Sequence, residues 1–235
     1  MPERVPPEVA AIRQGIEDCL DAVDDTGKVV GNASFGVYAF YDYDGEPIYV
    51  GQTSERLRVR IRRHLTNQRT DAVAMNVLDP FEVADVEMWP LFDLEGRAAR
   101  DPQVLARLNA AEYTVYRLVL EGSGFSAVLN EKDMIPAPEI ELPPSLRRRI
   151  VPPHVWELRS HPDVRIARRA STIAALARVI SERKVSVGLR RTLLTQARRI
   201  ERLAADRLSQ AEGEIPVEAP GEETGELRFW DDDDL

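Results

Sequence analysis

Residues 36–51 read GVYAFYDYDGEPIYVG, and this stretch decides the fold. Both of its ends are rich in aromatic and β-branched residues, which favour β-strands. Asp44-Gly45 lies between them, and an Asp-Gly pair between two such runs is a strong signal for a β-hairpin. The sequence therefore predicts two antiparallel strands, at residues 35–41 and 47–50, joined by a tight turn.

The length of that turn decides which side chains the hairpin brings together. Side chains alternate between the two faces of a strand. A two-residue turn would place Phe40 opposite Tyr49, and a four-residue turn would place Tyr38 opposite Tyr49. In both cases the two tyrosines share a face, whereas a three-residue turn would separate them. We expect Tyr38 and Tyr49 to lie close together on one face of the hairpin.

A helix is predicted to follow the hairpin and to end at about residue 67, with Thr53 or Ser54 as its cap. Arg60 and His64 are four residues apart, so they are neighbours on one face of this helix. The short connection at residues 50–52 keeps them near Tyr49. Two phenols, a guanidinium and an imidazole thus gather around a glycine, a set that suits phosphodiester cleavage but has no carboxylate for a divalent metal.

The hairpin and the helix after it carry a family resemblance. Gly36-Val37-Tyr38, followed after ten residues by Tyr49-Val50-Gly51, resembles the GIY-YIG nuclease signature in its common GVY and YVG spelling. Leu57-Arg58-Val59-Arg60 resembles the helix segment that follows it. Glu112 and Asn130 match the helix glutamate and the later asparagine of the family by position and local pattern. The resemblance covers roughly residues 35–132. The spacing of Arg60 and His64 is similar to that in small restriction and homing endonucleases of this family.

The resemblance implies a role for each residue. Glu112 would be the single protein ligand to Mg²⁺ or Mn²⁺, which would stabilise the leaving 3′ oxygen. Arg60 would bind the scissile phosphate. Tyr38 or Tyr49 would activate the attacking water, with His64 as a proton relay. Asn130 would orient the site.

The sequence departs from the family pattern in two places. Many members have lysine directly after the second tripeptide, where this chain has Gln52, which is unable to act as a base. Residues 67–100 are also long for a minimal domain of the family, so an insertion is expected there.

The predicted fold class is α+β, with a small mixed β-sheet, flanking helices and a C-terminal helical hairpin. Further strands are expected at residues 81–89 and 125–129, and further helices at residues 7–23, 100–121, 163–184 and 186–208, with Ser186 as a cap. The predicted units are an N-terminal helical extension (1–34), a nuclease domain (35–135), a Pro/Arg-rich linker (136–153), a basic helical hairpin (154–210) and an acidic disordered tail (211–235).

Charge is segregated along the chain. The net charge is -9, yet residues 147–207 carry 16 Lys+Arg against 5 Asp+Glu, and residues 211–235 carry 10 Asp+Glu against one Arg. Basic segments of this kind favour contact with DNA phosphates. The predicted DNA contacts are Gly51, Arg58, Arg62, Arg63, Arg147, Arg148, Arg149, Arg190 and Arg191.

Other function classes are excluded or left open. The single cysteine, Cys19, excludes an internal disulfide and a cysteine-based zinc cluster. No apolar run is long enough for a membrane span and no secretory signal is visible, so a cytoplasmic location is expected.

The sequence favours a metal-dependent DNA endonuclease, with restriction or phage defence as its setting. A non-catalytic DNA-binding or adaptor protein, or a helical interaction protein acting through residues 145–208, remains the alternative. A homodimer and a protein partner for the acidic tail are further expectations.

Overall fold

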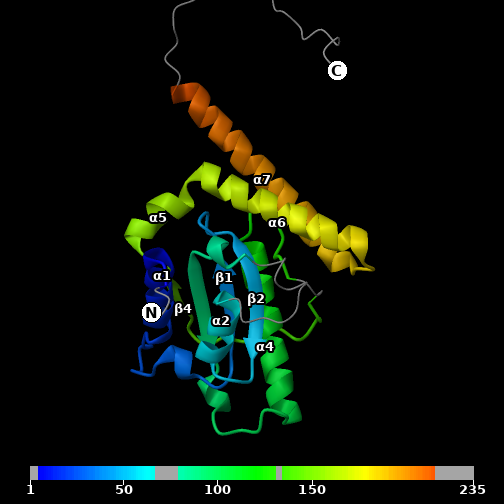
Figure 1. The fold of residues 1–235 in the computed structure, drawn as a ribbon. Helices are drawn as coiled ribbons and strands as arrows, with labels where there is room; N and C mark the ends of the chain where they lie inside the picture. The colour runs from blue at the N-terminus through cyan, green and yellow to red at the C-terminus, as the bar shows by residue number, and fades with distance from the viewer. Residues whose placement is uncertain (1–4, 67–78, 131–133, 215–235) are drawn as a thin grey trace, which may run out of the picture.

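The computed structural model describes residues 5–66, 79–130 and 134–214. At its centre is a four-stranded sheet with the strand order β2-β1-β3-β4 (Figure 1). The strands are β1 (Gly36–Tyr41), β2 (Pro47–Thr53), β3 (Asp85–Pro90) and β4 (Leu146–Arg149). The predicted α+β class is confirmed, but the sheet is antiparallel throughout and not mixed. The chain that follows β2 returns to the far side of β1, so β3 meets only antiparallel neighbours.

Helices cover both faces of the sheet. On one face α1 (Pro7–Leu20) and α2 (Leu57–Leu65) pack against Tyr38 and Phe40 of β1. On the other face α4 (Pro102–Glu121) packs against Val37 and Ala39. Three short 3₁₀ helices, η1 (Val30–Asn32), η2 (Pro80–Glu82) and η3 (Phe92–Leu94), lie in the connections. Because side chains of β1 alternate between the two cores, the strand is buried along its whole length.

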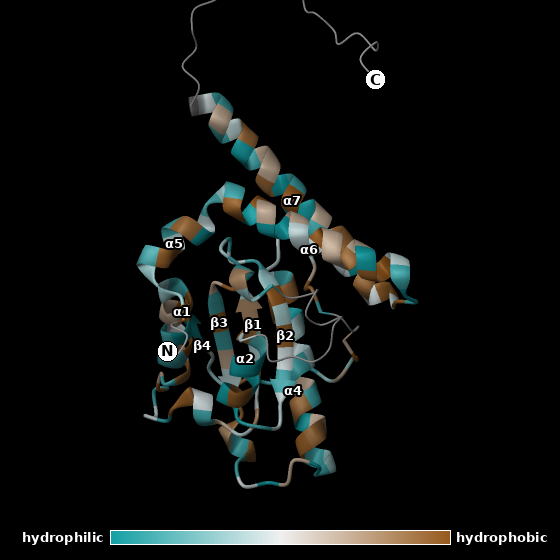
Figure 2. Ribbon diagram, viewed as in Figure 1, coloured by the Kyte–Doolittle hydropathy of each residue, from teal (hydrophilic) through white to brown (hydrophobic). Residues whose placement is uncertain are grey.

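The C-terminal part is helical, as predicted. After α5 (Pro153–Ser160), the helices α6 (Pro162–Glu182) and α7 (Val187–Glu214) form a hairpin that lies above the turn between β1 and β2 (Figure 1). Hydrophobic and hydrophilic residues alternate along both helices (Figure 2). Leu176, Val179 and Leu189 pack against one another and form the buried contact between the two helices. The Ser186 hydroxyl accepts the Leu189 N–H at 3.3 Å, which confirms the predicted cap.

Two predicted segments are corrected by the structure. Leu146–Arg149, inside the predicted linker, is strand β4, which pairs with the open edge of β3. Asp85 of β3 holds it by ion pairs to Arg147 at 2.9 Å and Arg149 at 3.7 Å, so the three consecutive arginines concealed a strand. Residues 125–129 are not a strand, because Ser126 adopts a φ of 48°, in the left-handed region.

Some of the remaining predictions fall on described residues and others do not. Helix α7 continues to Glu214 and so includes the first residues of the predicted tail. The rest of that tail, residues 215–235, and residues 67–78 of the expected insertion lie outside the described residues. No helix in the described ranges is both long and apolar enough to cross a bilayer.

Candidate active site

The turn between β1 and β2 differs from both predicted forms, but the tyrosines still share a face. The Asp42 N–H donates to the Glu46 carbonyl, and the Gly45 N–H to that of Asp42, with Gly45 at φ +78°. This is a three-residue turn of the type that ends in a left-handed glycine. Alone it would pair Tyr49 with Ala39 and turn Tyr49 to the other face.

A β-bulge in β2 restores the register. Tyr41 pairs with Pro47, but the next pair is Phe40 with Tyr49, so Ile48 is an extra residue in β2. The observed Phe40–Tyr49 pair is the one expected for a two-residue turn. Tyr38 and Tyr49 therefore lie on the same face, with ring centroids 6.0 Å apart.

Both tyrosine side chains converge on Gly51. A Cβ atom at Gly51 would lie 2.9 Å from the Tyr38 hydroxyl oxygen and 3.0 Å from that of Tyr49. It would also lie 2.7 Å from Cε1 of Tyr49. These distances are too short for any side chain at this position. The last glycine of the motif is thus required because two hydroxyl groups occupy the space beside its backbone.

Helix α2 brings His64 to this pair. The Tyr38 hydroxyl oxygen lies 3.4 Å from both ring nitrogens of His64, and Tyr38 and His64 are both fully buried. The Tyr49 ring contacts the same imidazole at a centroid distance of 5.1 Å. The predicted neighbourhood of Tyr38, Tyr49 and His64 is therefore present. The predicted cap is wrong, because no side chain caps α2 and its Leu57 N–H donates to the Ala33 carbonyl at 3.0 Å.

Arg60 and Glu112 are electrostatically linked beside the tyrosines. Burial lowers the pKa of Arg60, but Tyr38, Tyr49 and Glu55 outweigh this effect and leave the pKa above its usual value. Burial raises the pKa of Glu112 to about 7, against the lowering effects of the Gln52 N–H and the Arg60 guanidinium. Glu112 on α4 thus lies at the edge of β2, close to the phosphate-binding arginine expected from the sequence.

Asn130 lies on the free edge of β2. Its Nδ2 donates to the Val50 carbonyl at 2.8 Å, and its Oδ1 accepts the Val50 N–H at 3.0 Å. The Leu129 N–H donates to the Ile48 carbonyl at 2.9 Å. An amide side chain therefore takes the place of a strand neighbour, and holds the backbone between Tyr49 and Gly51.

Gln52 and Asn109 form a contact that sequence reasoning missed. Gln52 Nε2 donates to Asn109 Oδ1 at 2.8 Å, and the Gln52 backbone N–H donates to the Glu112 carboxylate. Gln52 is no base, as expected, but it ties β2 to α4 at the level of Glu112. The available signal was the spacing of Asn109 and Glu112, which are three residues apart and hence neighbours on one helix face.

The donor set fits a hydrated hard cation. A divalent ion such as Mg²⁺ prefers carboxylate oxygen and keeps several waters when one carboxylate holds it. Glu112 supplies such a carboxylate, partly buried and close to Arg60. No group of three or more His, Cys, Asp or Glu side chains forms a metal cluster within the described residues.

Comparison with known proteins agrees with this geometry. Residues 34–98 match the model of the GIY-YIG catalytic domain. The chain carries a GIY-YIG domain. This match assigns a nuclease-type function in general, and it includes Tyr38, Tyr49, Arg60 and His64. Glu112 and Asn130 lie outside the matched range and are brought to the site by the tertiary structure. No curated protein and no solved structure matches the chain.

Several predicted DNA contacts of the GIY-YIG domain already have carboxylate partners. On α2, Arg58 pairs with Asp21 at 2.7 Å, Arg62 pairs with Glu17, and Arg63 pairs with Glu55. These side chains are partly exposed, and exposed ion pairs stabilise a fold by only about 0–1 kcal/mol. A DNA phosphate can therefore compete for these arginines at little cost.

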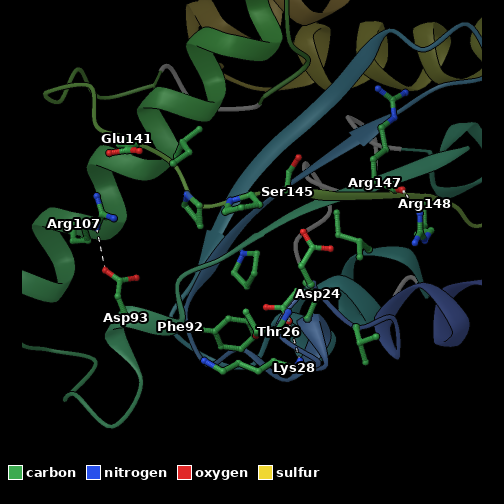
Figure 3. A pocket seen from close by; sticks show the side chains of 18 residues that line it. Asp24, Thr26, Lys28, Phe92, Asp93, Arg107, Glu141, Ser145, Arg147 and Arg148 are labelled. Atoms are coloured by element: carbon green, nitrogen blue, oxygen red, sulfur yellow. Dashed lines mark hydrogen bonds and ion pairs between the residues drawn. The ribbon is translucent and has the colours of Figure 1, made fainter.

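The arginines of β4 lie apart from Tyr38 and Tyr49. The Arg147 guanidinium lies 3.7 Å from the centre of the Tyr41 ring, on the α4 side of the sheet. Arg147 and Arg148 line one end of a cavity of about 900 Å³, with Arg107 and Asp93 at the other end (Figure 3). Tyr38, Tyr49, Arg60, His64 and Glu112 do not line this cavity. The structure does not bring Arg147 and Arg148 together with the candidate active site.

Proposed function

We propose that the protein is a DNA endonuclease that depends on a divalent metal ion. The observation that carries this proposal is the convergence of the Tyr38 and Tyr49 hydroxyls over Gly51, with His64 alongside. Arg60 and Glu112 lie next to this group, on two further elements. Five polar side chains from β1, β2, α2 and α4 thus gather at one edge of the sheet, a concentration that a packing role alone does not require.

Each side chain has a chemical role in this proposal. Tyr38 would accept the proton of the attacking water and pass it to His64, which its hydroxyl contacts. Arg60 would bind the scissile phosphate and offset its developing negative charge. Tyr49 would orient the water, and Asn130 would hold the β2 backbone that carries Tyr49. Glu112 would hold Mg²⁺ or Mn²⁺, which when bound stabilises the leaving 3′ oxygen.

The arginines of α2 would contact DNA phosphates on either side of the scissile bond. Arg58, Arg62 and Arg63 lie on the same helix as Arg60. Arg190 on α7 is exposed and Arg191 follows it, so the helical hairpin would add a more distant contact. Restriction or phage defence is the setting we propose, by analogy with other nucleases of this pattern. Symmetric cutting of both strands would favour a homodimer.

Cleavage of supercoiled and phage DNA tests this proposal. We expect cutting by the wild type that requires Mg²⁺ or Mn²⁺ and is lost in both Glu112→Gln and Arg60→Ala. Glu121→Gln, an exposed substitution on the same helix, is the matched control and should cut normally. Cleavage that persists in Glu112→Gln, or that needs no metal, would contradict the proposed site. Binding without cutting in all variants would favour the adaptor function.

A further inference from the structure

A buried ion-pair cluster joins α6 and α7 to the turn between β1 and β2. Its carboxylates are Asp42, Asp44 and Glu82, and its guanidinium groups belong to Arg165, Arg168, Arg169 and Arg199. The Asp42 side chain is 1% exposed, that of Arg169 5% and that of Arg199 3%. Charges buried to this degree must keep their partners, because an unpaired buried charge is strongly destabilising. Four arginines of these basic helices therefore pair with carboxylates of the domain, which leaves them less able to bind DNA phosphates.

The two oxygens of Asp42 point to different parts of the molecule. Oδ1 accepts the backbone N–H groups of Asp44 at 2.8 Å and Glu46 at 3.0 Å. Oδ2 lies 2.8 Å from Nη2 of Arg169 and 3.3 Å from Nη2 of Arg199. The side chain that shapes the three-residue turn is thus itself held by the C-terminal helices.

Arg199 also reaches the second strand. Its Nη2 donates to the Pro47 carbonyl at 3.4 Å, and its own carbonyl accepts Nη1 of Arg169 at 3.2 Å. Pro47 precedes the extra residue Ile48, and Asp42 follows the end of β1. One guanidinium therefore spans both sides of the hairpin at the bulge that places Tyr49 beside Tyr38.

We infer that Arg199 is a positioning residue for the active site. By bridging Asp42 and Pro47 it fixes the turn and the bulge, and so the register that keeps both tyrosines on one face. Without the bulge Tyr49 would turn to the α4 face, because side chains alternate along a strand. The inference rests on the proposed nuclease function, but the register itself can be measured without DNA.

The first test compares Arg199→Gln with Arg198→Gln, an exposed neighbour on the same helix. We expect Arg199→Gln to lower kcat about 100-fold, the effect of a small misplacement of reacting groups. KM should change little, because the arginines of α2 remain. Amide hydrogen exchange over residues 42–50 should become faster in Arg199→Gln and stay unchanged in Arg198→Gln. Unchanged exchange in Arg199→Gln would overturn the inference, whether or not the wild type cuts DNA.

A disulfide between β1 and β2 fixes the register of the two strands independently of Arg199. The N–H and C=O of Val50 face Asn130, so Ala39 and Val50 form a pair without hydrogen bonds between them. Their Cα atoms are then about 4.5 Å apart, within reach of a disulfide. Both side chains lie in the α4 core, away from the tyrosines.

The rescue uses Ala39→Cys and Val50→Cys in a Cys19→Ala background. Once oxidised, this pair should restore most of kcat to Arg199→Gln, and reduction should remove the gain. The same disulfide with Arg199 intact is the reference, and circular dichroism checks that every variant is folded. If kcat stays low in the oxidised protein, the register is not what Arg199 controls and the inference fails. Absence of cutting by the oxidised reference would instead count against the proposed function.

Discussion

Asn130 and Val50 are joined by two hydrogen bonds, one from the Asn130 side chain to the Val50 carbonyl and one from the Val50 N–H to the Asn130 side chain. The amide is suited to this contact because it offers a donor and an acceptor side by side. The edge of β2 is thereby paired next to the proposed active-site residues, although residues 125–129 are not a strand.

Replacing this amide by a carboxylate should loosen β2. In Asn130→Asp the Val50 carbonyl loses its donor, which costs about 1–3 kcal/mol of the free energy of unfolding if it stays unsatisfied. We expect a lower urea midpoint and a lower kcat. Asn32→Asp, an exposed substitution in η1, is the control and should change neither quantity. Unaltered stability and cleavage in Asn130→Asp would show that this contact is dispensable.

Metal binding at Glu112 should depend on pH near neutrality. The pKa of Glu112 is raised to about 7 by burial, and a carboxylate must lose its proton to hold a cation. Protons therefore compete with Mg²⁺ below this pH. We expect the apparent Mg²⁺ affinity to fall about tenfold for each pH unit below the pKa and to level off above it. Calorimetric titration over this range measures the effect, with Glu112→Gln as the reference; a flat profile would exclude Glu112 as the ligand.

A methyl group at Gly51 should disturb both tyrosines. Gly51→Ala places a Cβ within 3.0 Å of the Tyr38 and Tyr49 side chains, which are tightly packed. Overpacking of this kind costs about 1–3 kcal/mol, and cleavage should be lost because the hydroxyls move. Gly213→Ala is the matched control, because nothing lies within 4 Å of its added Cβ in α7. Thermal unfolding and plasmid cleavage of the two variants should diverge clearly.

Cys19 should be inert in the folded protein and should make stability sensitive to high pH. Burial raises the pKa of the Cys19 thiol to about 12, well above the usual value of about 8.5. The folded state thus favours the neutral thiol, so its contribution is complete below the usual pKa and is lost as the pH rises towards 12. We expect no reaction with a thiol reagent at neutral pH until urea unfolds the chain. Relative to Cys19→Ala, the wild type should lose stability as the pH increases through this window.

Local pattern alone was sufficient for several features of this protein. The hairpin at residues 36–51, the helix that carries Arg60 and His64, and the C-terminal helical hairpin all follow from short-range periodicity and turn chemistry. These signals survive because each involves residues only a few positions apart. The placement of Tyr38 and Tyr49 on one face was also expected, although the structure reaches it by a three-residue turn and a bulge.

Long-range contacts decided the rest. Strand β4 was not predicted because it consists mostly of arginines, and Arg147 and Arg149 are paired with Asp85 on a strand that is distant in the sequence. The bulge at Ile48 was not predicted either. Arg199 and Asp42 meet beside it, but they are far apart in the sequence. The basic composition of residues 147–207 suggested DNA contact, yet Arg165, Arg168, Arg169 and Arg199 are paired with carboxylates of the domain. The sequence by itself determined which reactive groups exist and which local elements carry them. Only the tertiary structure determined their register and their charge partners, because burial and ion pairing depend on segments that meet in space.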